Sequence, residues 1–270
     1  IITQSTLTMQ QKHFARRGEY EVSAIKAAHS IIGRTAWDHI CTKQINPKAK
    51  YYVNNESLRK EFYCDTWKYE DAERHSVVVS QANYPVKGFH YCVEAVRIVK
   101  EFYPDVKVYV CGSNDTYKTG LKASTYGLYI LDRIKKYGLQ NNIVFLGSQN
   151  AGQMKQRMLR GNVFVSPSTI ENSPNSVGEA MLLGVPIVSS NVGGISSMLD
   201  NGTEGLLYPS DEAYILAENI MKVFQSDQYA EELGRAARAH AQKTHSRENN
   251  AKVLVEIYSD IVTRIHQGEK

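Results

Sequence analysis

Between residues 76 and 209 the sequence alternates short apolar runs with amphipathic segments, joined by short connections. Segment 87–105, for example, places Phe89, Val93 and Val96 at helical spacing and ends at Pro104. The apolar runs have the length and composition of strands that are buried on both faces of a sheet. They cover residues 76–80, 106–112, 142–147, 162–168, 185–190 and 204–209. This alternation predicts a doubly wound α/β fold with a parallel sheet.

The N-terminal part of the chain follows a different pattern. A long polar helix (7–29) precedes a strand (30–35), a helix (36–46) and a second strand (49–55). These elements are too few to close a core of their own, so residues 1–55 are predicted to be part of an incomplete second α/β domain. The chain begins with Ile and shows no signal peptide, and we therefore expect this domain to be truncated.

Two further segments complete the predicted organisation. Residues 56–75 are charged and have little periodicity, which predicts a linker before a main domain at 76–245. Residues 211–266 are almost entirely helical, with a final helix at 246–270. That helix gathers four apolar residues on one face, which indicates packing against another part of the protein: Leu254, Ile257, Ile261 and Ile265.

Composition and motifs exclude several classes of protein. The net charge of +4, from 32 basic and 28 acidic residues, is too small to indicate nucleic-acid binding. No apolar run is long enough to span a bilayer, and the 4 cysteines show no C-x-x-C spacing, which favours a reducing cytoplasm. No G-x-G-x-x-G follows a strand, no P-loop is present, and no cluster of metal ligands is visible, so we expect neither a dinucleotide cofactor nor a metal.

The stretch IENSPNSVGEAMLLG, residues 170–184, follows the strand-like run 162–168 and opens a helix. We expect Ser173 to cap this helix and Pro174 to be its first residue. The free N–H groups of Asn175, Ser176 and Val177 would then face the carboxyl end of the sheet. Ligands bind at that edge in parallel α/β folds, and a helix N-terminus suits an anion such as a diphosphate.

Two carboxylates flank this helix start. Glu171 lies on the preceding loop and can reach a polyol or a developing cation, whereas Glu179 lies within the helix and can accept hydrogen bonds from two adjacent ribose hydroxyls. The arrangement suits a nucleotide sugar. On spacing alone, a second interpretation is equally good: Glu171 is a surface charge on a loop, and Glu179 is an acid stabilised by the helix dipole.

The longer stretch FVSPSTIENSPNSVGEAMLLGVPIVSSNVGGISSMLDNGTEGLLYP resembles the donor-binding half of retaining glycosyltransferases of family four. These enzymes have the GT-B architecture of two Rossmann-like domains. The resemblance rests on the E-x7-E motif of Glu171 and Glu179, the strand GVPIVSS and the pair Gly193-Gly194. It extends back through NIVFLG to the V-K-G at 86–88 and covers roughly residues 50–265.

The resemblance implies a donor-binding set of residues. Lys87, followed by Gly88, would contact the donor diphosphate, and Gly147 would lie beside the donor. Glu171 would be the catalytic residue at the donor sugar, and Glu179 would hold the ribose. Family members usually carry an Arg upstream of the Lys, whereas this chain has Gln81 there. Arg34 and Lys122 are weak candidates for a substitute cation.

The resemblance further implies transfer of a sugar from a nucleoside diphosphate to a glycan or lipid-linked acceptor, without metal or cofactor. Residues 1–55 would be the tail of the acceptor-side domain, and helix 246–270 would cross back onto it. The missing part of that domain could bring the protein to the inner face of the membrane. The alternatives are a sugar synthase or phosphorylase of the same fold, and a non-catalytic module that binds nucleotide sugars. The chain alone is expected to bind donor but to transfer sugar poorly.

Overall fold

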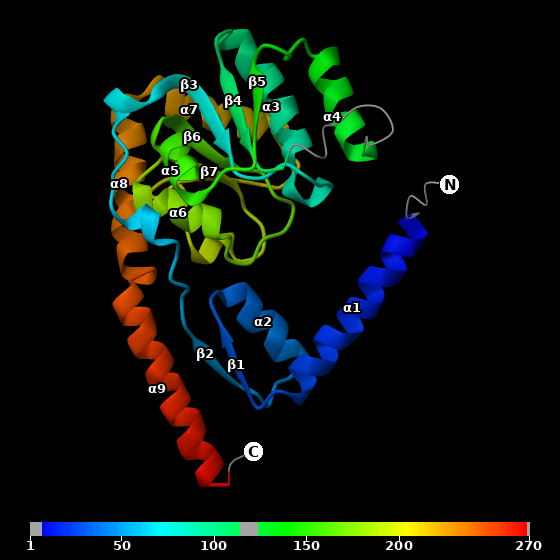
Figure 1. The fold of residues 1–270 in the computed structure, drawn as a ribbon, viewed down its shortest axis with the longest axis vertical. Helices are drawn as coiled ribbons and strands as arrows, with labels where there is room; N and C mark the ends of the chain where they lie inside the picture. The colour runs from blue at the N-terminus through cyan, green and yellow to red at the C-terminus, as the bar shows by residue number, and fades with distance from the viewer. Residues whose placement is uncertain (1–6, 114–123, 269–270) are drawn as a thin grey trace. The chain divides into compact units, whose positions relative to one another are not determined.

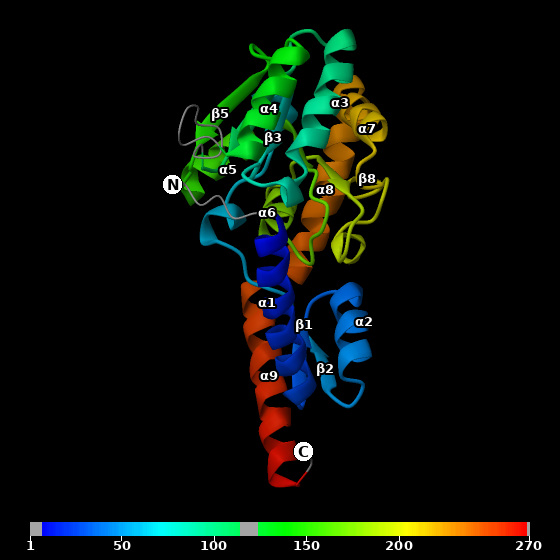
Figure 2. The ribbon, with the colours of Figure 1, turned by 90° about the vertical axis from the view of Figure 1, so that its right-hand side faces the viewer.

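The computed structural model describes residues 7–113 and 124–268. The chain divides into two compact units, one formed by Ile1–Asn55 with Glu248–Lys270 and the other by Glu56–Arg247 (Figures 1 and 2). In the described part of the chain, no helix combines the length and the apolar character that are needed to cross a membrane.

The larger unit contains a six-stranded, fully parallel sheet in the order β5-β4-β3-β6-β7-β8 (Figure 1). The chain proceeds from β3 outward through β4 to β5 and then returns to the other side of β3 with β6. This reversal at the β3/β6 pair is the topological switch point at which α/β proteins bind ligands. The strands are β3 (Glu73–Val79), β4 (Lys107–Cys111), β5 (Ile143–Gly147), β6 (Gly161–Ser166), β7 (Ile187–Ser190) and β8 (Leu206–Tyr208).

Helices connect and cover these strands. Among them, α3 packs on α4 and α7, whereas α6 packs on α5 and α8. Their bounds are α3 (Phe89–Phe102), α4 (Thr125–Lys136), α5 (Ala151–Leu159), α6 (Asn175–Leu183), α7 (Ala213–Gln225) and α8 (Asp227–Thr244). Every residue of β6 is buried, as expected for a central strand that is covered on both faces. The predicted doubly wound α/β fold is therefore confirmed.

The segment predicted as a linker, 56–75, is instead part of the larger unit. Leu58, Phe62 and Trp67 are buried in its core, and the Trp67 indole N–H donates a 2.7 Å hydrogen bond to the Gly161 carbonyl. The segment forms two short 3-10 helices, η1 (Lys60–Tyr63) and η2 (Tyr69–Asp71), and its last residues already belong to β3. Three large apolar side chains spread among many charges leave little periodicity in the sequence, although they suffice to anchor the backbone.

The smaller unit is built from α1 (Leu7–Ala27), β1 (Ser30–Gly33), α2 (Ala36–Ile45), β2 (Lys50–Val53) and most of α9 (Arg247–His266). Strands β1 and β2 pair in parallel. Polar contacts fix its turns: Thr35 and Asp38 form a capping box at the start of α2, and the Asn46 amide donates to carbonyls at the end of α1. That this unit is the tail of an acceptor-side domain stays a prediction.

Candidate functional site

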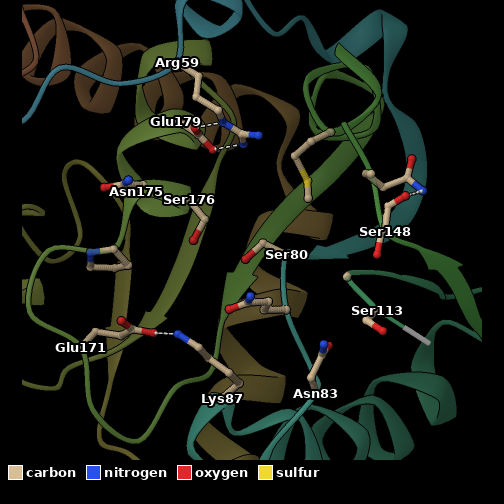
Figure 3. Close-up of a pocket in the computed structure, with 15 residues that line it drawn as sticks. Arg59, Ser80, Asn83, Lys87, Ser113, Ser148, Glu171, Asn175, Ser176 and Glu179 are labelled. Carbon is tan, nitrogen blue, oxygen red and sulfur yellow. Dashed lines mark hydrogen bonds and ion pairs between the residues drawn. The ribbon is translucent and has the colours of Figure 1, made fainter. Parts of the chain in front are cut away.

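A pocket of about 640 Å³ opens in the larger unit at the carboxyl ends of β3, β4, β5 and β6 (Figure 3). Described residues that come after each of these strands line the pocket, as the position of the switch point requires. The lining residues are Arg59, Ser80, Gln81, Asn83, Lys87, Gly112, Ser113, Ser148, Gln149, Met154, Glu171, Pro174, Asn175, Ser176 and Glu179.

The start of α6 differs in detail from the prediction. Pro174, with φ −70° and ψ 123°, is the N-cap, and no side chain caps the helix, so Ser173 does not have the predicted role. The Val177 N–H donates a 3.0 Å hydrogen bond to the Pro174 carbonyl, and Val177 is fully buried. The prediction that Val177 offers a free N–H to the pocket is therefore wrong. Asn175 and Ser176 do line the pocket, at the helix end where backbone N–H groups lack partners within the helix.

The first carboxylate of the motif is paired with the predicted lysine. The Lys87 Nζ lies 2.6 Å from Glu171 Oε1 (Figure 3). The Ser168 hydroxyl donates a 2.8 Å hydrogen bond to the same oxygen. Both side chains are largely shielded, with 22% of Lys87 and 15% of Glu171 exposed. The loops that follow β3 and β6 are thus joined by a charged contact inside the pocket.

Glycines fix the position of this charged contact. Gly88 has φ 66°, and a Cβ there would lie 1.7 Å from the Pro167 carbonyl oxygen, so only glycine lets the two loops meet. A Cβ on Gly193 would likewise lie 1.9 Å from the Glu171 carbonyl oxygen. The N–H of the next residue, Gly194, donates a hydrogen bond to the same carbonyl. Gly88 does not line the pocket itself, and its contribution in the structure is this loop contact.

The second carboxylate is paired with a residue that the sequence analysis missed. Arg59 donates from Nε to Glu179 Oε1 at 2.6 Å and from Nη2 to Glu179 Oε2 at 2.7 Å (Figure 3). Glu179 is only 2% exposed, and such burial of a carboxylate requires a charged partner. The hydrogen bonds to Glu179 raise the pKa of the Arg59 guanidinium, although burial acts in the opposite direction. No motif singles out Arg59, because its segment has no periodicity.

Of the remaining residues that the sequence analysis named, some line the pocket and others do not. Gln81 lines the pocket, as predicted, whereas Gly147 does not and is followed by Ser148 and Gln149, which do. Arg34 belongs to the smaller unit, and Lys122 lies outside the described residues. The ends of β4 and β5 also contribute Ser113 and Ser148, whose positions follow from the sheet order and not from any local pattern.

No histidine is among the residues found to line this pocket. His90, near the start of α3, is half-buried and lies 3.2 Å from the Tyr126 hydroxyl, and burial lowers the pKa of its imidazole. Over the described residues, no group of three or more His, Cys, Asp and Glu side chains is placed to hold a metal ion. Among the described residues that line the pocket, the charged groups are two cations and two carboxylates.

Residues 68–240 match the model of the family described as glycosyl transferases group 1. The chain belongs to this family. The matched range contains Lys87, Glu171 and Glu179 but begins after Arg59. Membership confirms the resemblance at the level of the glycosyltransferase family.

Curated proteins with similar sequences are named as glycosyltransferases, in agreement with the group 1 family. The chain is 25% identical over 185 residues to a D-inositol 3-phosphate glycosyltransferase of Corynebacterium urealyticum, covering 68% of this chain and 42% of that protein. It is 27% identical over 190 residues to an uncharacterized glycosyltransferase of Methanocaldococcus jannaschii, covering 70% and 45%. The chain therefore spans less than half the length of these relatives.

Solved structures confirm the GT-B fold of this group 1 chain. Anabaena HepE, solved in complex with UDP and glucose, has a TM-score of 0.78 at 20% identity, over 92% of this chain and 68% of that one. The sucrose-phosphate synthase of Thermosynechococcus elongatus has a TM-score of 0.78 at 19% identity, over 92% and 62%. At these identities the similarity establishes the fold alone.

Proposed function

We propose that this chain forms the donor-binding part of a retaining glycosyltransferase that moves a sugar from a nucleoside diphosphate to a glycan or lipid-linked acceptor. The observation that carries the proposal is the composition of the pocket at the switch point. Lys87, the first residues of α6 and the two carboxylates of the E-x7-E motif line one cavity of about 640 Å³. That HepE was solved with UDP and glucose is consistent with such a donor.

Each pocket element has a defined role in this proposal. The first turn of α6 and the Lys87 ammonium bind the diphosphate and stabilise the negative charge that develops on it as the glycosidic bond breaks. Glu179 accepts hydrogen bonds from the ribose hydroxyls. Glu171 faces the sugar, where a carboxylate binds hydroxyls and favours an oxocarbenium-like transition state. The pocket cations supply the charge that the diphosphate needs, so we expect donor binding to persist in EDTA.

Calorimetry with nucleoside diphosphates and their sugars tests the proposal. The discriminating quantity is a ratio of affinities measured on the same variant. Glu171→Gln should reduce the ratio of nucleotide sugar to nucleoside diphosphate, because Glu171 contacts the sugar. Glu179→Gln should leave that ratio unchanged but reduce the ratio of nucleoside diphosphate to inorganic pyrophosphate, because Glu179 contacts the ribose.

Glu218→Ala, on the exposed side of α7, is the matched control and should change neither ratio. The proposal fails if no nucleotide sugar of uracil, guanine or adenine binds the wild-type chain. It also fails if both glutamate variants leave both ratios at the wild-type values. We expect little transfer to an acceptor by the chain alone, because closure over the sugar in such enzymes involves both domains.

A further inference from the structure

The charged residues that line the described pocket balance one another. Arg59 and Lys87 supply two positive charges, and Glu171 and Glu179 supply two negative charges. Each cation is held by one carboxylate: Lys87 by Glu171 at 2.6 Å and Arg59 by Glu179 at 2.6 Å. A dianionic diphosphate that enters this pocket meets no unpaired cation among them. A diphosphate can therefore take over the donors that hold Glu171 or Glu179 only if that ion pair exchanges partners.

The backbone that carries Arg59 is held firmly. We call residues 56–63 the strap. The Glu56 carbonyl lies 2.8 Å from His245 Nδ1, and the Leu58 N–H donates to the Tyr63 hydroxyl, which itself donates to the His245 carbonyl. These contacts fix both ends of the strap to the end of α8. The backbone of Arg59 is therefore held beside the pocket by these hydrogen bonds.

The strap also packs closely on α6. A Cβ on Gly178 would lie 2.8 Å from His245 Nε2 and 2.8 Å from Leu58 Cδ1, so the absence of a side chain there lets the strap approach the helix. The Arg59 guanidinium stacks on the buried Phe62 ring, with its Cζ 4.8 Å from the ring centroid. Because Glu179 follows Gly178 directly, the close packing of the strap on α6 sets the distance between Arg59 and Glu179.

The side chain of Arg59, unlike its backbone, has room to move. Its side-chain atoms are 44% exposed, whereas the side-chain atoms of its partner Glu179 are almost completely buried. Glu179 lies four residues after Asn175, so a phosphate at the first turn of α6 is displaced from it by about 6 Å along the helix axis. A rotation of a flexible arginine covers such a distance.

We propose that Arg59 exchanges partners when donor binds, from the Glu179 carboxylate in the empty pocket to the donor diphosphate in the occupied one. The ribose hydroxyls then take the place of the guanidinium on Glu179. This inference rests on the proposed function. It adds Arg59 to Lys87 as a second cation that binds the diphosphate, in a pocket where Gln81 supplies no charge. Arg59 lies outside the residues that match the family model. The observed pair with Arg59 neutralises the charge of the buried Glu179 carboxylate.

Inorganic pyrophosphate is the probe that separates the two halves of the exchange, because it offers phosphates without ribose hydroxyls. In the wild-type chain pyrophosphate must break the Arg59–Glu179 pair with nothing to replace it. Glu179→Gln removes that competition, so pyrophosphate should bind roughly three- to tenfold more tightly, as expected when a charged hydrogen-bonding group is released. Because the loss of a negative charge by itself favours an anion, this gain must be compared with a variant that also lacks Arg59.

The double variant Arg59→Gln/Glu179→Gln decides whether Arg59 carries that gain. It should return pyrophosphate affinity to the wild-type value or below, and Arg59→Gln alone should weaken binding of nucleoside diphosphates. Arg97→Gln, an arginine on α3 outside the pocket lining, is the matched control and should have no effect. Circular dichroism of each variant confirms that it is folded before titration.

Unchanged pyrophosphate affinity in Glu179→Gln, or a gain that survives in the double variant, would overturn the exchange. These outcomes differ from failure of the proposed function, in which the wild-type chain binds no nucleotide sugar. If nucleotide sugars bind with the expected ratios and pyrophosphate shows no gain, Arg59 is a static partner of Glu179. The proposed function then stands while the exchange is rejected.

Discussion

The two units of the chain differ in how much apolar surface they bury. In the larger unit, residues such as Val77, Phe164 and Ile187 are fully buried. In the smaller unit, Thr35, Asn250 and Ile257 are the buried residues among those whose exposure is described, while Phe14 is 74% exposed and Ile40 is 61% exposed. Hydrophobic burial stabilises the first, whereas caps and side-chain hydrogen bonds hold the second. All the described residues that line the candidate site belong to the first, so donor binding and the stability of the smaller unit should be separable.

The largest expected effect is on isolated units. A chain of residues 56–247 should unfold cooperatively on heating and retain affinity for nucleoside diphosphates, because its core and its pocket are internal to it. A peptide of residues 1–55 should show no cooperative transition, since it has too little buried apolar surface to offset its conformational entropy. Circular dichroism checks both. A cooperative melt of the peptide would contradict the comparison.

The same truncation should have a large effect on stability in one unit and almost none in the other. Ile187→Ala, in fully buried β7, should lower the free energy of unfolding by about 2–5 kcal/mol, because it leaves a cavity. Ile40→Ala, on α2, should change it by less than about 0.5 kcal/mol, since the side chain is already exposed and alanine favours helix. Urea denaturation of the whole chain measures both, and similar costs would show that the smaller unit has a core that exposure does not reveal.

Two glycine-to-alanine substitutions, one in each unit, extend the comparison of the units to close packing. Gly178→Ala should destabilise the larger unit by about 1–3 kcal/mol and weaken donor binding, because the new Cβ meets His245 and Leu58 and displaces the strap. Gly18→Ala should stabilise α1 by about 0.5–1 kcal/mol, since a Cβ there meets no atom within 4 Å and the backbone is helical. Thermal melts give the stabilities. Binding by Gly178→Ala with wild-type affinity would show that the strap can shift without moving Arg59.

The smallest expected effect concerns Asp260, in the smaller unit. Its hydrogen bond from Lys50, 2.8 Å long, holds its pKa below the ordinary value of 3.8. A carboxyl whose pKa is lowered by folding contributes stability above its unfolded pKa, and this contribution is lost as the pH falls through the folded value. Asp260→Asn should therefore lower the unfolding midpoint slightly at neutral pH and not at all in strong acid. A difference that grows on acidification would contradict this assignment.

Sequence patterns predicted those features that depend on local periodicity. The strands and helices of the sheet were predicted because buried strands are continuous apolar runs. The beginning of β3 was missed by three residues because Glu73, Arg74 and His75 are polar and lie at the sheet end. The helix start at 175 was placed one residue early, since both Ser173 and Pro174 are common at helix starts.

The candidate site was predicted at the positions that short local motifs mark. Lys87, Glu171 and Glu179 all line the pocket, as the motifs suggested. Arg59 could not be predicted, because its contact with Glu179 joins residues 120 positions apart. The only local indication was the pair Leu58 and Phe62, four positions apart, which could have shown that the supposed linker packs on the core.

The pairing of β3 with β6 has a consequence for the order of folding. It joins positions such as Ser76 and Asn162, which are hydrogen-bonded across 86 residues of chain. Closing so long a loop is entropically costly, and contacts of high sequence separation slow folding. Because Lys87 follows β3 and its partner Glu171 follows β6, this part of the pocket cannot form before the two strands meet. Recovery of nucleotide binding during refolding should therefore lag behind helix formation and report the moment at which the central strands join.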